Sequence, residues 1–212
     1  MANWVIISDL ATGIGTLVLA VATFSSVKAA KQSAKVSEQA LLTANRPLLI
    51  ASHIYDPAEK VRFVDNKFTK LPGGHAYISV TKDVIYFAIS VRNIGQGPAV
   101  LDHWSFSTDE AGAREMGNLK NFRRLIRDVY VAPNDVGVWQ SAIRGAKDTQ
   151  FKSAVKAIRE HRTLFLRVQY ADQEGGQRIV SLFALVPHGK DEWLASAGRH
   201  WRIDGVDPRE QP

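Results

Sequence analysis

The pattern of apolar and polar positions divides the chain into stretches with different periodicities. From Leu10 to Val27 eighteen consecutive residues carry no charge, which is long enough for a helix to cross the hydrocarbon core of a bilayer. From Ser26 to Asn45 the sequence is rich in Ala, Lys and Gln and lacks Gly and Pro, as in a stable helix. After Pro47, short β-branched and aromatic runs alternate with turn residues, which predicts strands. We therefore predict a transmembrane helix (1–27), a helical stalk (28–46), a β-sandwich domain (47–205) and a frayed tail (206–212).

The uncharged stretch is interpreted as a membrane anchor. Trp4 suits the membrane interface, and Asp9 fits the start of a helix, where the macrodipole favours a carboxylate. Two alternatives remain. Ala20-Val21-Ala22 matches the small-x-small pattern of a signal-peptide cleavage site, although the preceding residues lack Lys and Arg. The stretch also has the composition of a buried core helix.

Charges beside the anchor predict its orientation. No Lys or Arg precedes it, whereas Lys28, Lys31 and Lys35 follow it. Because basic residues are retained on the cytoplasmic side, we expect the N-terminus outside the cell inner membrane and the soluble domain in the cytoplasm.

The stalk carries a weak heptad pattern that predicts self-association. Small or apolar residues recur at a 3-4 spacing, which is the seam of a coiled coil. They are Val27, Ala30, Ala34, Ser37, Leu41 and Ala44. Arg46-Pro47 ends the helix, because Pro disfavours helical geometry at the preceding residue. A homo-oligomer through anchor and stalk is therefore an expectation.

The region after Pro47 predicts a mainly β domain. Strands are expected at Leu48–Tyr55, Ala76–Thr81, Val84–Arg92, Val100–Ser107, Val136–Ile143, Thr163–Ala171 and Gln177–Val186. Seven short strands with turn signals favour an immunoglobulin-like antiparallel β-sandwich, with a β-barrel as the alternative. Helices are expected at Ala113–Val129, from its apolar stripe, and at Asp148–Arg162, with Asp148-Thr149 as its cap. Trp193 and Trp201 indicate that the segment after Gly189 packs on the sheet.

Composition excludes some classes of site. The chain has no Cys, so disulfides, thiolate metal sites and a Cys nucleophile are absent. From Arg46 onward, 24 Lys and Arg stand against 19 Asp and Glu, and this mild excess is typical of a solvated basic surface. No histidines form an H-x-H or H-x₃-H pair, and no Walker, kinase or G-x-S-x-G motif occurs. We therefore expect no cofactor and no metal.

Two local motifs deserve comparison with known sites. Asn93-Ile-Gly-Gln-Gly-Pro98 contains Gly-x-Gly, but Pro98 and a β-run follow where a phosphate loop needs a helix. It is interpreted as a tight turn in which Asn93 bonds the local backbone. Asp102-His103 is an acid–base pair in sequence, but adjacent strand residues point to opposite faces. The layout of anchor, Ala/Lys-rich helix, Arg46-Pro47-Leu48 and Val91-to-Ala99 turn phrase resembles uncharacterised bacterial single-pass membrane proteins with an immunoglobulin-like domain. The resemblance implies that fold and no functional residues.

The basic residues of the expected first inserted helix are the candidate surface. They are Lys120, Arg123, Arg124 and Arg127. Near an anionic leaflet each is worth about 1 kcal/mol, so lipid or an acidic partner is the expected ligand and a solvated helix face the alternative. Nucleic acid is not expected, because aromatic residues are not interleaved with the charges.

Together these features favour a membrane-anchored, non-enzymatic interaction module whose protein partner is unknown. The first alternative is a hydrolase or sugar-active enzyme with a site assembled from distant residues. The second is an extracytoplasmic domain that binds ligand or envelope components, if the topology is reversed.

The orientation is testable with a reporter. Alkaline phosphatase fused to the C-terminus is expected to be inactive in cells, because it needs an oxidising periplasm to form its disulfides. A strongly active fusion would contradict this prediction and indicate the opposite topology.

Overall fold

The computed structural model describes residues 2–204, and side chains from residue 13 onward. The chain divides into two compact units, Met1–Ala44 and Asn45–Pro212. The predicted positions of the Trp4 and Asp9 side chains and the predicted frayed tail lie outside the described residues.

The first unit is one helix, α1 (Ala2–Ala44), without a break between the predicted anchor and stalk. Its 43 residues correspond to a length of about 64 Å at 1.5 Å per residue. From residue 13 onward every residue up to Ala44 is exposed. Among the described residues it is the one helix long and apolar enough to cross a membrane, a test that a signal sequence also passes. A buried core helix is not observed.

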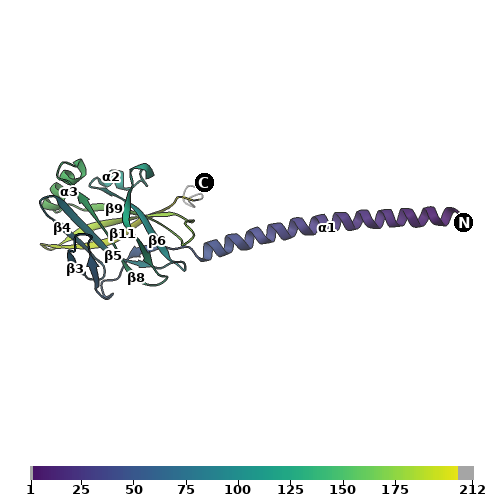
Figure 1. Cartoon of the computed structure of the whole chain (residues 1–212), viewed down its shortest axis with the longest axis horizontal. Coiled ribbons are helices and arrows are strands. Elements are labelled where there is room, and N and C mark those ends of the chain that lie inside the picture. Colours follow the sequence, from purple (N-terminus) through teal and green to yellow (C-terminus); the bar gives the residue numbers. More distant parts are fainter. Residues whose placement is uncertain (1, 205–212) are drawn as a thin grey trace. The chain divides into compact units, whose positions relative to one another are not determined.

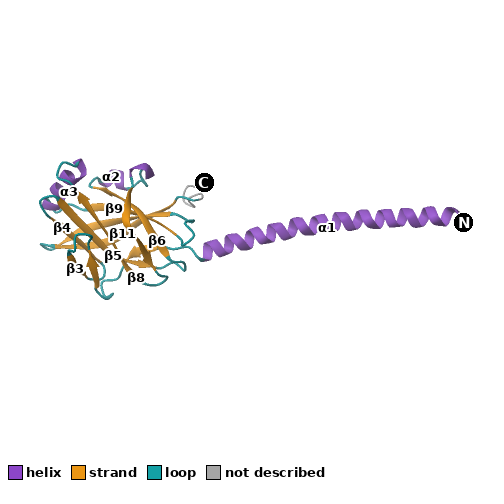
Figure 2. Cartoon of the chain, viewed as in Figure 1, coloured by secondary structure: helices purple, strands orange, loops and turns teal. Residues whose placement is uncertain are grey.

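The second unit is β-rich (Figures 1 and 2). Its strands are β1 (Leu49–Ala51), β2 (Glu59–Arg62), β3 (Phe68–Leu71), β4 (His75–Val80), β5 (Val84–Asn93), β6 (Ala99–Ser107), β7 (Arg123–Val131), β8 (Val136–Arg144), β9 (Leu164–Ala171), β10 (Ile179–His188) and β11 (Glu192–Arg202). Its helices are α2 (Glu110–Ala113), the 3-10 turn η1 (Leu119–Asn121) and α3 (Thr149–Arg159).

Nine strands form one antiparallel sheet. One edge of β5 pairs with β8. The other edge pairs with β4 along Ile85–Ile89 and with β1 along Val91–Asn93. From β4 the order continues through β11, β10, β9, β6 and β7. The sheet curls into a half-barrel. The strands at its two ends, β7 and β8, follow one another in the sequence. The two ends of the curled sheet are therefore joined by the turn between β7 and β8. In the described residues no hydrogen-bonded ladder between these two strands closes the sheet into a barrel.

The concave face of the sheet encloses the main core. Trp104 and Trp139 lie at its centre, with ring centroids 5.5 Å apart in an edge-to-face arrangement that is favourable for aromatic pairs. The helix α3 adds Phe151, Ala154 and Ala157 to this core. Asp148 caps α3 by accepting from the Gln150 amide, as predicted.

Two flaps cover the outer face of the sheet. The β2–β3 hairpin buries Val61 and Phe63 against Tyr86 of β5. The α2–η1 segment packs around Val180 and Trp201. Each flap thus shields apolar outward-facing residues that would otherwise be exposed on a two-sided sheet.

Several sequence predictions are confirmed. The fold is mainly β with an N-terminal apolar helix, and all seven predicted strands are present with shifted ends. Trp193 and Trp201 are buried, each 6% exposed, in β11. The Asp172–Gly176 turn joins β9 and β10, with Gly175 at a φ of 78°. An immunoglobulin-like sandwich is not confirmed, because the nine strands form one continuous curled sheet.

The predicted helix at Ala113–Val129 is wrong. Gly117 adopts a φ of 79°, a left-handed conformation that interrupts a helix, and the Asn118 side chain caps the η1 turn. From Arg123 the chain is the strand β7, in which Leu125 is buried and Ile126 is 76% exposed. The 3-4 spacing of apolar residues matched a helix by chance, and pairing with β6 decided the conformation.

The junction between Asn45–Leu48 and the Asn93–Pro98 turn is held by one buried side chain. The Oδ1 of Asn93 accepts hydrogen bonds from the amides of Leu48 (3.1 Å) and Gly95 (3.0 Å). Its Nδ2 donates to the carbonyls of Gly97 (2.8 Å) and Val131 (3.1 Å). The local backbone bond predicted for Asn93 is confirmed, and bonds to two distant segments add to it.

Two glycines allow this close approach. A Cβ on Gly95 would collide with the carbonyl oxygen of Arg46, and one on Gly97 with the carbonyl oxygen of Asn45. The Gly-x-Gly sequence therefore serves backbone packing.

Asn93→Ala is expected to lower the free energy of unfolding of the full chain by about 3 kcal/mol or more, because it leaves two buried carbonyls and two partly buried amides without a partner. Urea unfolding in detergent, followed by tryptophan fluorescence, measures the change. Asn121→Ala, on the exposed η1 turn, is the matched control and should stay within about 0.5 kcal/mol of wild type. Equal effects of the two substitutions would contradict this role of Asn93.

Candidate functional site

The sheet is open between β7 and β8. In the described residues each of these strands has one hydrogen-bonded neighbour, β6 for β7 and β5 for β8. The turn between them is ordered by an Ala132–Asp135 backbone bond, with Asn134 at a φ of 60°. Beyond that turn no ladder joins the strands, so each presents an edge with unused backbone donors and acceptors. We call the space between these edges the seam.

A large bulge shapes the β7 side of the seam. Leu101 of β6 is paired with Val129, but His103 is paired with Arg124. The single residue Asp102 thus lies opposite the four residues from Leu125 to Asp128. Bulges of this kind bend a strand and redirect its side chains. Ile126, Arg127 and Asp128 are consecutive and all exposed, so β8 does not cover this part of the β7 edge.

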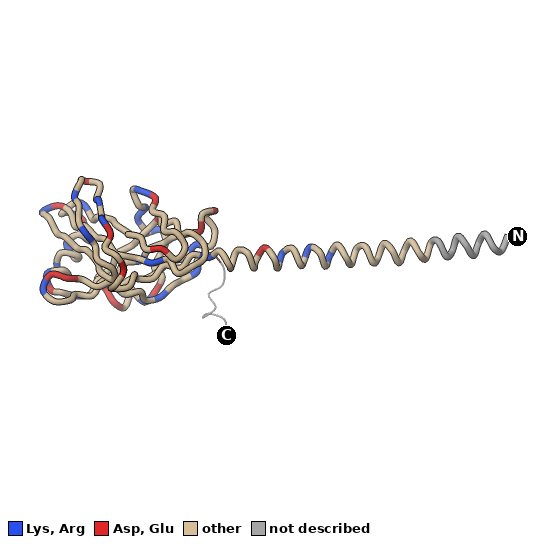
Figure 3. The backbone as a smooth tube through the Cα atoms, turned by 90° about the horizontal axis from the view of Figure 1, so that it is seen from below, with Lys and Arg blue, Asp and Glu red and all other residues tan. Residues whose placement is uncertain are grey.

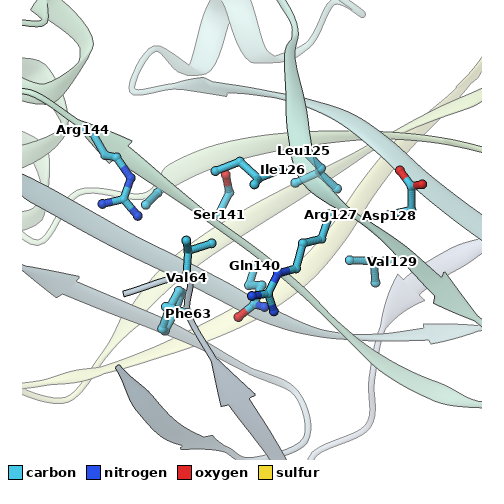
Figure 4. Close-up of a pocket in the computed structure, with 11 residues that line it drawn as sticks. Phe63, Val64, Leu125, Ile126, Arg127, Asp128, Val129, Gln140, Ser141 and Arg144 are labelled. Carbon is cyan, nitrogen blue, oxygen red and sulfur yellow. The ribbon is translucent and has the colours of Figure 1, made fainter. Parts of the chain in front are cut away.

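A cavity of about 120 Å³ lies in the seam. Its lining comes from the β2–β3 flap, from β7 and from β8 (Figure 4). The lining residues are Phe63, Val64, Leu125, Ile126, Arg127, Asp128, Val129, Gln140, Ser141, Ala142 and Arg144. Six of these eleven residues are apolar, and the charged members lie at the rim, where Arg144 and Asp128 are exposed. The arrangement can receive an apolar side chain and offer charges beside it.

A polar network fixes the flap beside the cavity. The hydroxyl of Tyr86 donates to Asp65 (2.6 Å), and the guanidinium of Arg144 donates to the same carboxylate oxygen (2.8 Å). The hydrogen bond from Arg144, followed by that from Tyr86, lowers the pKa of Asp65 below its ordinary value. The same contact with Asp65 raises the pKa of Tyr86. The Gln140 side chain also donates to the Arg62 carbonyl (3.0 Å). This bond attaches the β2–β3 flap to β8, which forms one side of the seam.

The structure separates the four predicted surface residues. Lys120 lies on the η1 turn, and the others lie on β7. Arg123 is bonded to Asp148 (2.9 Å) and lies over the Trp104 ring at 5.6 Å, so its charge serves the α3 cap and the core. Arg124 is exposed and Arg127 lines the cavity. Basic and acidic positions are interspersed over the β-rich unit (Figure 3). Binding of lipid or an acidic partner by these residues stays a prediction. The helical face on which it was based is not present, because these residues lie on the η1 turn and on β7.

The bulge also changes one expectation about Asp102 and His103. Because it breaks the regular alternation of side chains, the His103 Nδ1 lies 3.2 Å from the Asp102 carboxylate. The expectation of opposite faces is therefore wrong at this position. Both side chains are about one third exposed, at 36% and 34%. No group of three or more His, Asp or Glu side chains suited to a metal occurs among the described residues.

A buried hydroxyl chain was not foreseen from the sequence. The Tyr170 hydroxyl accepts from the Leu49 amide (3.0 Å) and lies 2.8 Å from Ser181 Oγ, which lies 2.7 Å from His200 Nδ1. Burial raises the pKa of Tyr170 to about 12. Ser181 has no exposed surface, so a substrate has no access to its oxygen. We interpret this chain of polar groups as a structural link between β1 and the strands β9, β10 and β11.

The seam itself was missed because β7 was expected to be a helix. A signal was present: Leu125, Val129 and Val131 alternate with polar or exposed positions, and Val129-Tyr130-Val131 is typical of strands. The β2 and β3 strands carry several charged residues, and no pattern indicated them.

Comparisons with known proteins do not assign the chain to a family. No family model matches it, and no curated protein does. A solved protein from Archaeoglobus fulgidus is similar over 62% of this chain and 95% of its own, at 14% identity and a TM-score of 0.26.

The Asp65 network predicts a pH-dependent stability difference. Because the folded pKa of Asp65 is lowered, its charge stabilises the fold above the ordinary value of 3.8, and this contribution is lost as the pH falls through the lowered pKa. The difference in unfolding free energy between wild type and Asp65→Asn should thus be constant near neutral pH and shrink below about pH 4. On an Arg144→Gln background the pH dependence should weaken, and an unchanged dependence would contradict the assignment.

Proposed function

We propose that the protein is a membrane-anchored, non-enzymatic interaction module that binds an extended segment of another polypeptide at the seam. The observation that carries the proposal is the pair of uncovered strand edges on either side of an apolar cavity. Added strands bind through main-chain hydrogen bonds, and pockets for alternate side chains supply selectivity.

The proposal accounts for features that otherwise disfavour a stable soluble protein. Uncovered edges are aggregation hazards that proteins normally block with charges, bulges or covering loops. The β7 edge carries a bulge, yet Ile126 (76%) and Tyr130 (65%) are strongly exposed beside it. Exposed apolar residues gathered at one edge favour a site that a partner covers.

The anchor supports the location of this activity. The apolar helix with Lys28, Lys31 and Lys35 after it favours a single span of the cell inner membrane with the domain in the cytoplasm. Confinement to a membrane raises the local concentration of partners in the same membrane, so a modest interface is sufficient for binding.

The test is site-specific photo-crosslinking in membranes of cells that express the full chain. A photoreactive amino acid at Val64, which lines the cavity and is 49% exposed, should form a discrete adduct with a protein. Ile126→Asp should abolish that adduct, because a desolvated charge opposes strand addition at this edge.

Ile54→Asp is the matched control. Ile54 is also exposed, at 58%, and does not line the cavity, so the adduct should persist. Binding at the seam would be refuted if the adduct formed equally well in both variants, or if both variants lost it to the same extent.

A further inference from the structure

The exposed face of β7 carries a symmetric charge pattern. Arg124, Ile126 and Asp128 are all exposed and stand at alternate positions, so a basic, an apolar and an acidic residue follow one another at a spacing of two. In the described part of the chain no ion pair or side-chain hydrogen bond involves Arg124 or Asp128. Their charges are available to a partner.

This pattern is complementary to itself. When two copies of β7 lie antiparallel with a two-fold axis at Ile126, each Arg124 faces Asp128 of the other copy and the two Ile126 side chains meet at the axis. Opposite charges in such cross-strand pairs stabilise a sheet and like charges destabilise it. A closed two-fold contact uses the same surface on both copies, which is what this pattern offers.

The neighbouring registers are unfavourable. With the axis at Leu125, Arg123 faces Arg127 of the other copy. With the axis at Arg127, the two Arg127 side chains face each other. Charge therefore selects one register, although the backbone edge alone would accept several.

We propose that the segment bound along the β7 edge is β7 of a second copy of this chain. The proposal rests on the proposed function and names its partner. The edge is accessible, because Ile126, Arg127 and Asp128 are exposed on both faces of the strand. Tyr130, 65% exposed on the same face as Ile126, extends the contact. Two chains anchored in one membrane meet at a raised local concentration.

The first experiment exchanges the charges in the full chain, purified in detergent and measured by sedimentation equilibrium. Arg124→Asp alone and Asp128→Arg alone should each weaken self-association at least about tenfold, because both cross-strand pairs become like-charged. An equimolar mixture of the two variants should form a one-to-one heterodimer, in which both pairs are again opposite. The double variant Arg124→Asp/Asp128→Arg should self-associate as wild type does.

The second experiment uses the absence of cysteine from the chain. Ile126→Cys should form an intermolecular disulfide under mild oxidation, because residues at the axis of an antiparallel pair lie within the roughly 4.4–6.8 Å between Cα atoms that a disulfide needs. Tyr55→Cys is the control: Tyr55 is 96% exposed, is not part of β7, and should remain reduced.

The outcomes separate this proposal from the general one. Loss in the single variants, recovery in their mixture and a disulfide at position 126 support the β7 dimer. Equal dimerisation of all charge variants assigns self-association to the anchor and stalk and overturns the β7 dimer. A Val64 adduct with a different protein, without a disulfide at position 126, retains binding at the seam and overturns the second copy as its occupant. If neither the Val64 adduct nor the disulfide at position 126 forms, both the β7 dimer and binding at the seam are overturned.

Discussion

The rest of the structure depends on the four hydrogen bonds of the buried Asn93 side chain. They join the segment that leaves α1, the Gly95–Gly97 turn and the end of β7. The Asn93 amide itself donates to Asp135 in the β7–β8 turn. One residue therefore fixes both where the chain enters the sheet and where the two ends of the sheet meet. A buried amide with every partner satisfied specifies one arrangement, because each alternative leaves polar groups unpaired.

The seam exists because β7 and β8 are held together at one end only. Near the Asn93 junction β7 and β8 are held together, and Gly137 lies directly against Val131. Farther along, the bulge opposite Asp102 bends β7, and the strands do not form a ladder. The Asp65–Tyr86–Arg144 network then fixes the β2–β3 flap beside the gap. The result is a frame held by hydrogen bonds around an unpaired strand edge, and the binding proposed at this edge would profit from such preorganisation.

Charge on this protein acts locally. Arg123, one of the four basic residues noted in the sequence, is paired with Asp148 and lies over the Trp104 ring, whereas Arg124 and Arg127 are exposed on the same strand. The order of charges along β7 is therefore more informative about this surface than the net basic excess of the chain. Because the basic, apolar and acidic residues follow one another in a fixed order, only some registers of strand pairing bring opposite charges together.

The sequence by itself determined the apolar helix, seven of the strands, the Asp148 cap and the turns at Asn93 and Asp172, because each is specified by local periodicity or by one side chain bonding nearby backbone. It did not determine β7, because Leu119, Phe122 and Ile126 follow the spacing of a helix, or the charged strands β2 and β3. It also did not determine β11, whose segment was expected only to pack on the sheet. The partners of Asn93 lie up to 45 positions from it, and the curl of the sheet depends on still more distant pairings, such as that of Trp193 with Ala76. Local patterns specify which face of a strand is apolar, but only packing of the whole chain decides which strands become neighbours and which edges stay open.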